Sequence, residues 1–187
     1  MDVTAFRENL ETTWEGSAAI GADGTTDGDT ADTEEDTAGH APAPAILNIP
    51  RIGLREEVLE LGLEDDGTLE VPAEGGDVGW YSPDERAATG YPLVFTGHVD
   101  TAAGPAVFAR LLELEPGDEV AVTDVGGQVL TYRVDRVADH PVDAYPTLDV
   151  FGPAPKDEIR LITCTGVFDD VRQQYEENRV VYASRSR

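Results

Sequence analysis

The sequence has little cysteine, little lysine and no long apolar run. Its 187 residues include one Cys, so no disulfide can form within the chain and no cysteine-type zinc site is available. No apolar stretch approaches the roughly 18 residues that a membrane-spanning helix needs. The N-terminus also lacks the basic and then apolar pattern of a signal peptide.

Positive charge is scarce as well. Thirteen Lys and Arg stand against 38 Asp and Glu, which gives a formal net charge of −25. Residues 1–41 contain eleven of the acidic residues and one Arg, so the rest of the chain still carries −15. This charge excludes binding to nucleic-acid backbones or anionic membranes by bulk electrostatics, and we expect no nucleic-acid partner.

The N-terminal part divides into two segments. Residues 1–16 place Val3, Phe6, Leu10 and Trp14 on one face of a predicted short amphipathic helix, which either packs on the domain or serves as a lid or partner-binding helix. Residues 17–44 form a predicted acidic, flexible linker. Residues 21–45 contain no Phe, Trp, Tyr, Leu, Ile or Val, a composition that buries too little surface to offset the entropy of ordering.

Residues 45–187 have the pattern of a mainly β domain. Short apolar or alternating runs are separated by turn signals such as Asp65-Asp66-Gly67, for which a hairpin is a simpler explanation than a metal site. Pro105 followed by Phe108, Leu111 and Leu112 predicts one short helix over 106–112. Roughly eight short strands and few helices indicate a closed or nearly closed β-barrel.

Two apolar strands each end in a residue that can react. The only cysteine, Cys164, ends the run 160–164, and His98 follows the apolar run 93–96, 66 positions upstream. A lone Cys is more often a buried core residue. However, a nucleophilic thiol needs a base or cation beside it, and His98 can supply either.

A cation near the thiol would stabilise an anionic tetrahedral intermediate. Arg172 and Arg179, both downstream of Cys164, are the candidates. The two other histidines suggest no chemistry. His40 lies in the predicted linker, and His140, beside Pro141, is expected in a loop exposed to solvent.

Several motifs together resemble the sortases, and among them the actinobacterial class F group. The resemblance covers about residues 45–183. The Leu-x-Thr-Cys ending combined with the upstream Gly-His is the specific part of it. The matching segments are Pro50, Gly67, Val71-Pro72, Gly79-Trp80-Tyr81, Thr96-Gly97-His98-Val99-Asp100, Gly104-Pro105-Ala106-Val107-Phe108, Leu111, Leu114, Pro116-Gly117-Asp118, Leu161-Ile162-Thr163-Cys164, Tyr175, Asn178 and Val180-Val181-Tyr182-Ala183.

The resemblance implies a sortase catalytic domain over 45–187, with an eight-stranded sortase-type β-barrel and one or two short helices. It also implies a cysteine transpeptidase that cleaves a sorting signal similar to Leu-Pro-x-Thr-Gly between Thr and Gly. Cys164 would form the thioacyl intermediate, and His98 would protonate the leaving amine and deprotonate the incoming one. Thr163 would help to line the substrate groove.

The family also uses an arginine on its last strand to hold the substrate and stabilise the oxyanion. Aligning the closing Val-Val-Tyr-Ala segment could place Asn178 at this position. Strand alternation puts Arg179 on the face of Val181 and Ala183, and we favour Arg179 with Arg172 as the alternative.

The implied partners are a sorting-signal peptide of secreted surface proteins and an amine acceptor such as a peptidoglycan precursor, with no cofactor and no metal. The implied location is the extracellular face of the membrane or the cell wall, although this chain shows no N-terminal membrane anchor of the family's kind. Two other functions are compatible with the residues. One is a peptidoglycan-directed Cys hydrolase or L,D-transpeptidase, and the other is a non-catalytic cell-surface binding barrel.

Overall fold

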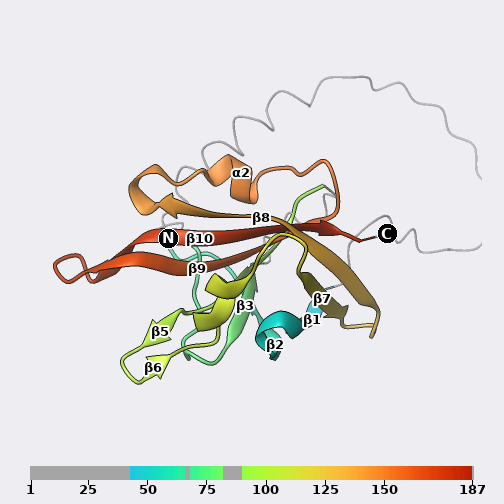
Figure 1. Ribbon diagram of the computed structural model, residues 1–187, viewed down its shortest axis with the longest axis horizontal. Helices are drawn as coiled ribbons and strands as arrows, with labels where there is room; N and C mark the ends of the chain where they lie inside the picture. The colour runs from blue at the N-terminus through green and yellow to red at the C-terminus, as the bar shows by residue number, and fades with distance from the viewer. Residues whose placement is uncertain (1–42, 66–67, 82–89, 187) are drawn as a thin grey trace, which may run out of the picture.

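The computed structural model describes residues 43–65, 68–81 and 90–186. Eight strands form a closed barrel in the order β1-β2-β3-β4-β9-β10-β8-β7 (Figure 1). This confirms the predicted mainly β barrel. The barrel strands are β1 (Pro44–Ile49), β2 (Leu54–Leu61), β3 (Val78–Tyr81), β4 (Leu93–Thr96), β7 (Glu119–Asp124), β8 (Val129–Pro141), β9 (Glu158–Asp169) and β10 (Gln174–Arg185).

Smaller elements connect the strands. A separate two-stranded sheet pairs β5 (Asp100–Thr101) with β6 (Gly104–Pro105), just after β4. The helical segments among the described residues are short: η1 (Pro50–Ile52), η2 (Ala109–Glu113), η3 (Val142–Ala144) and α2 (Thr147–Phe151). The predicted helix over 1–16 and most of the predicted linker lie outside the described residues, and β1 already begins at Pro44.

The helix predicted over 106–112 forms later and in a tighter geometry. The structure has the 3-10 helix η2 instead, from Ala109 to Glu113. Pro105 belongs to β6 rather than to a first helical turn. The backbone N–H of Phe108 donates to the carbonyl of His98 at 2.9 Å, so tertiary contacts hold the segment that was expected to start the helix.

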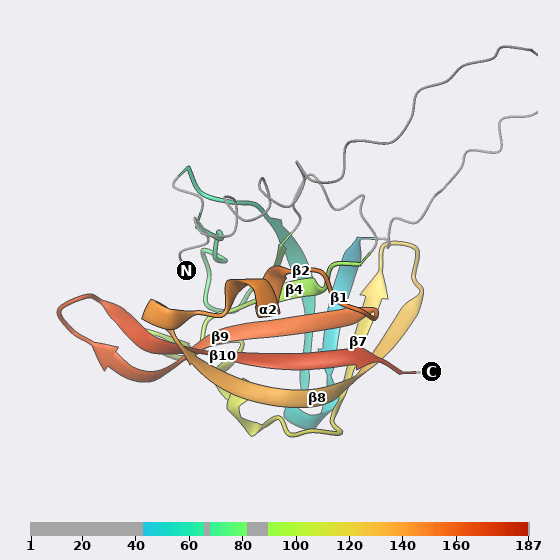
Figure 2. The same ribbon diagram turned by 90° about the horizontal axis from the view of Figure 1, so that it is seen from above.

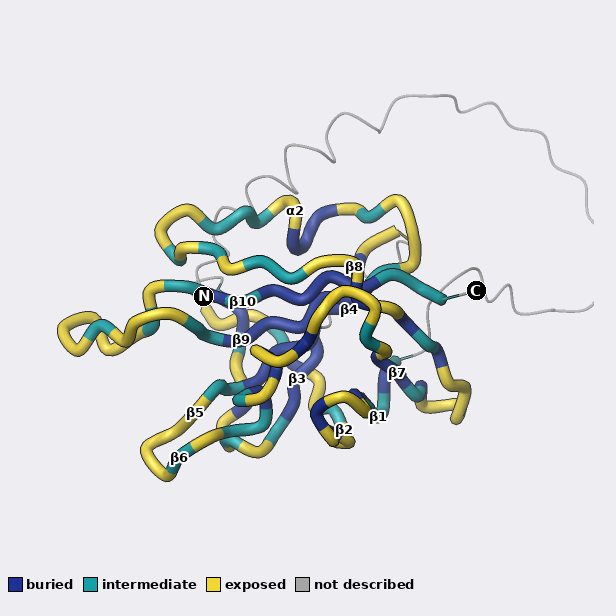
Figure 3. The backbone as a smooth tube through the Cα atoms, in the orientation of Figure 1, coloured by how far each residue is buried: buried dark blue, intermediate teal, exposed yellow. Residues whose placement is uncertain are grey.

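Apolar residues lie on both faces of β9 and β10. Side chains alternate along a strand, so Leu161 and Val181 belong to the cluster inside the barrel, while Ile162 and Val180 belong to a second cluster outside it. Helix α2 covers this outer face and contributes Val150 and Phe151 (Figure 2). The middle of β9 and β10 is therefore buried on both sides, whereas the hairpin that joins these strands is mostly exposed (Figure 3).

Candidate active site

His98 and Cys164 are delivered by neighbouring parallel strands. β4 pairs with β9 in parallel, and the last pair in this register is Thr96 with Ile162. His98 and Cys164 each follow that pair by two residues, so the two residues predicted from the sequence come after the same end of this pairing.

Two hydrogen bonds hold the segments that precede these residues together. The Thr163 hydroxyl donates to the carbonyl of Gly97 at 2.8 Å, and the N–H of Gly97 donates to the carbonyl of Ile162 at 3.3 Å. A Cβ on Gly97 would lie 2.9 Å from the ring of Phe108, so the close approach requires glycine here. Thr163 is 2% exposed and links the segments of Cys164 and His98, and its expected part in lining the substrate groove stays a prediction.

The imidazole of His98 is hydrogen-bonded to the backbone. Its Nε2 lies 2.8 Å from the carbonyl oxygen of Pro72. Because a carbonyl can only accept, Nε2 carries the proton and Nδ1 is the nitrogen that can accept in the neutral ring. The backbone of His98 is fixed through its carbonyl, which accepts from Phe108. Catalytic contacts are often formed only when substrate binds, so the present position of the ring is compatible with a role in catalysis.

Cys164 is half-buried and its surroundings favour the neutral thiol. Burial raises the pKa of Cys164, and the carboxylate of Asp100 raises it further. Asp100 lies in β5, just after His98, and accepts a 2.6 Å hydrogen bond from the hydroxyl of Tyr175 in β10. This bond connects the His98 side of the site to the β9–β10 hairpin. Since thiolate is the reactive form, Cys164 must lose its proton before it can attack.

Arg179 and Arg172 are both engaged with carboxylates. Arg179 binds Asp139 through two hydrogen bonds of 2.7 Å, and it also donates to the carbonyl of Leu112 at 3.1 Å. Its strand partner is Thr163, so it lies on the inner face as alternation predicted, and this is the face opposite to Cys164. Arg172, in the exposed hairpin, lies 3.3 Å from Asp143. Among the described residues, no contact joins either guanidinium to Cys164, so the role predicted for Arg179, or for Arg172, would require it to move.

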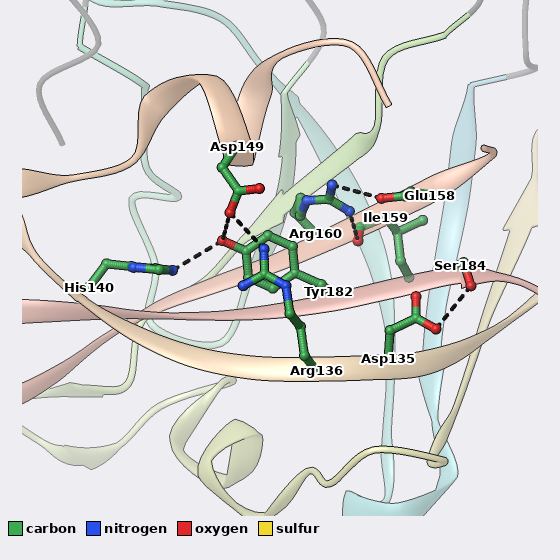
Figure 4. A network of polar contacts seen from close by, with 9 residues as sticks. All are labelled: Asp135, Arg136, His140, Asp149, Glu158, Ile159, Arg160, Tyr182 and Ser184. Carbon is green, nitrogen blue, oxygen red and sulfur yellow. Dashed lines mark hydrogen bonds and ion pairs between the residues drawn. The ribbon is translucent and has the colours of Figure 1, made fainter. Parts of the chain in front are cut away.

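His140 does not lie in a solvated loop as expected. It is near the end of β8, half-buried, with Nε2 3.0 Å from the hydroxyl of Tyr182. That hydroxyl donates to Asp149 at 3.1 Å, so His140 donates to it in turn (Figure 4). The expectation was wrong because β8 extends through Pro141 and pairs with β10 along that length.

The ring of Tyr182 lies between two arginines on this face. The guanidinium carbon of Arg136 is 3.3 Å from the ring centroid, and that of Arg160 is 4.6 Å from it. Arg136 also binds Asp149 at 2.6 Å, and Arg160 binds Glu158 at 2.8 Å (Figure 4). Each arginine on this part of the face therefore has a carboxylate partner, while the enclosed Nε of Arg160 makes no hydrogen bond in the described structure.

Two further residues near the thiol carry polar groups. Asn178 is the direct strand partner of Cys164 and is 4% exposed. Tyr145, between η3 and α2, has a hydroxyl that is enclosed and makes no hydrogen bond in the described structure. The sequence alignment already suggested Asn178 as an alternative to Arg179, but no periodicity marks Tyr145.

Within the described residues, no group of three or more His, Cys, Asp or Glu side chains is arranged to hold a metal ion. The same residues include no helix that is long and apolar enough to cross a membrane.

Comparisons with known proteins agree with this geometry. The family model described as "Sortase domain" matches residues 47–186. Solved structures similar to this chain include sortase A from Corynebacterium diphtheriae, with 25% identity, a TM-score of 0.56, and coverage of 78% of this chain and 61% of that one. Sortase C1 from Streptococcus agalactiae matches with 19% identity and a TM-score of 0.56, over 76% of this chain and 67% of that one.

Sortase C1 from Streptococcus suis also matches, with 19% identity and a TM-score of 0.56, over 79% of this chain and 74% of that one. A comparison with curated protein sequences found no match. The family match covers most of the chain and includes both strands that deliver His98 and Cys164. The chain therefore belongs to the sortase family, whose members are cysteine transpeptidases.

Proposed function

We propose that this chain is a class F sortase of the actinobacterial kind. It cleaves a sorting signal similar to Leu-Pro-x-Thr-Gly between Thr and Gly and transfers the acyl part to an amine, such as that of a peptidoglycan precursor. The observation that supports the proposal is the parallel pairing of β4 and β9, because His98 and the only cysteine of the chain each follow the last pair of this register by two residues. The transpeptidation takes place at the extracellular face of the membrane or in the cell wall.

The reaction has two acyl transfers. The thiol of Cys164 gives its proton to the imidazole of His98, and Sγ forms a bond to the carbonyl carbon of the Thr residue. The tetrahedral intermediate then expels the Gly amine, which takes the proton from His98, and a thioester remains on Cys164. An incoming amine attacks the thioester, loses its proton to His98 and releases Cys164.

The surroundings of the thiol explain why the proton transfer matters. Burial and the Asp100 carboxylate raise the pKa of Cys164, so the resting thiol is neutral and the enzyme depends on a base. Because Nε2 of His98 donates to the Pro72 carbonyl, Nδ1 is the nitrogen that can take the proton from the thiol.

Mass spectrometry of the intact protein tests this proposal. After incubation with a Leu-Pro-x-Thr-Gly peptide, we expect an adduct with the mass of the Leu-Pro-x-Thr acyl group on Cys164, removed by hydroxylamine or by an added amine. Cys164→Ala is the matched control and should carry no adduct. A wild-type protein that alkylates readily at Cys164 but never forms the acyl adduct would contradict the proposed substrate.

A further inference from the structure

Three residues form a row across three adjacent strands next to the thiol. Asn178 on β10 is the direct partner of Cys164 on β9 and of His140 on β8. Directly opposite residues in an antiparallel pair have their side chains on one face, with Cβ atoms about 4.5–5.5 Å apart. The carboxamide of Asn178 therefore stands beside the sulfur, between Cys164 and His140.

The side chain of Asn178 is buried beside the thiol. It is 4% exposed, and it lies opposite Cys164 in the strand pair. A carboxamide carries two N–H donors and one carbonyl acceptor. The N–H groups of Asn178 can therefore donate to a ligand that reaches the thiol.

A second donor lies over the same row. The ring of Tyr145 meets that of His140 edge-on, with centroids 6.0 Å apart, and its enclosed hydroxyl has no partner in the described structure. Burial raises the pKa of Tyr145, and Tyr182 and Cys164 add to the effect. The phenol therefore stays protonated and can donate, and the influence of Cys164 places the hydroxyl within electrostatic reach of the sulfur.

The cations that could serve instead are directed elsewhere. Arg179 follows Asn178 in sequence, but it lies on the opposite face and is held by Asp139 through its Nε and one terminal nitrogen, while the other terminal nitrogen donates to the carbonyl of Leu112. The hydrogen bond from Arg179 also holds the pKa of Asp139 below its ordinary value. Among the described residues, the charge that shifts the pKa of Cys164 is the anion Asp100.

We propose that the carboxamide of Asn178 and the hydroxyl of Tyr145 donate the hydrogen bonds that stabilise the oxyanion formed at Cys164. The inference rests on the proposed function. As Sγ bonds to the acyl carbon, the carbonyl π electrons move to oxygen, and the two neutral donors bind this oxygen. When the electrons return, the carbon–nitrogen bond breaks and the amine leaves with the proton from His98. This sortase thus uses neutral donors where the family pattern has a guanidinium.

The test measures single-turnover acylation of the full chain by a fluorogenic Leu-Pro-x-Thr-Gly peptide. Asn178→Ala should slow acylation by about 10²–10³ with little change in the peptide concentration for half-maximal rate, because the oxyanion exists only beyond the ground state. Tyr145→Phe, which keeps the ring, should cost about tenfold, the value of one neutral hydrogen bond. Asn48→Ala, the same change on β1 across the barrel, is the control for folding.

Asn178→Asp provides a second variant of nearly equal size. It replaces the N–H donors with an anion, so acylation should be at least as slow as in Asn178→Ala. If Asn178 served only to fill space, Asn178→Asp should instead acylate at nearly the wild-type rate. Arg179→Ala is measured beside these variants. The inference is overturned if Asn178→Ala acylates within threefold of wild type, or if Arg179→Ala loses more than Asn178→Ala does. A wild type that forms no adduct at all would instead overturn the proposed function, and this inference with it.

Discussion

The outer face of β8, β9 and β10 has two ends that differ in how their polar groups are satisfied. At one end, the row of Arg160, Tyr182 and Arg136 is connected by cation–π contacts and ion pairs to Glu158 and Asp149 (Figure 4). At the other end, in the row of Cys164, Asn178 and His140, the described structure shows a side-chain hydrogen bond for His140 alone, to the hydroxyl of Tyr182.

The strands, the twist and the covering helix are common to both rows, so the fold does not explain the difference. A paired row adds rigidity, because each group holds its neighbour in place. A row with few internal hydrogen bonds leaves its donors available to a ligand. The comparison therefore separates the part of the face that holds the barrel together from the part that is available for chemistry, and the predictions below test this division.

Changes at Cys164, and at His98 as its expected base, should affect catalysis more than folding. Cys164→Ala removes the nucleophile and should abolish transpeptidation. His98→Ala should lower it by about 10²–10⁴, the usual value of one positioned proton transfer. Peptide turnover is the measurement, with the thermal midpoint as the control for folding. Near-normal transpeptidation by either variant would contradict the assignment of the site.

Changes at the row of Arg160, Tyr182 and Arg136 should lower the stability of the fold more than peptide turnover. Glu158→Ala leaves Arg160, whose side chain is 6% exposed, without its carboxylate partner. Breaking a buried pair costs about 3–5 kcal/mol and an exposed one up to about 1, so we expect a loss of about 2–3 kcal/mol here. Urea unfolding of Glu158→Ala and of Glu176→Ala, an exposed control, measures this. A loss in peptide turnover without a loss in stability would mean that this row also takes part in the reaction.

The same comparison shows how far the sequence could lead. The alternation of apolar residues was enough to predict the barrel, and the two strand ends singled out His98 and Cys164, whose joint role stays a prediction. The placement of Arg179 away from the thiol was not predictable. Alternation shows that Arg179 shares a face with Val181 and Ala183, but it does not show which face carries Cys164. That depends on the register that pairs Asn178 with Cys164. His140 was misjudged because Pro141 suggested a loop, whereas it ends a long strand.

Asp100 should affect the thiol through its charge. Since its carboxylate raises the pKa of Cys164, Asp100→Asn should lower that pKa and increase the thiolate fraction near neutral pH. Alkylation by iodoacetamide should then be several-fold faster between pH 7 and 8, with the pH profile displaced toward lower pH. Tyr175→Phe is the matched control, because it removes the hydrogen bond to Asp100 but keeps the charge. If both variants react equally fast, opening of the hairpin rather than charge controls the thiol.

The smallest effect expected comes from charge spread over the whole surface. Residues from 42 onward carry −15 of the −25, and such an excess of like charge disfavours the compact state. Salt reduces the Debye length from about 10 Å at 0.1 M to about 3 Å at 1 M and should remove most of this repulsion. It also weakens exposed pairs such as Arg172 with Asp143, but each of these is worth at most about 1 kcal/mol.

Repulsion should dominate because acidic groups greatly outnumber the arginines available to pair with them, while the buried pair of Arg160 and Glu158 is little screened. A gain of about 1 kcal/mol would raise the thermal midpoint by about 3–5 °C. Calorimetry of the full chain from 0.05 to 2 M NaCl measures it, with Glu158→Ala alongside. The thermal midpoint of Glu158→Ala should rise with salt at least as much as that of wild type, since the variant lacks the Arg160–Glu158 pair that salt could weaken. A flat or falling midpoint in both proteins would mean that the carboxylates are already spread widely enough not to repel.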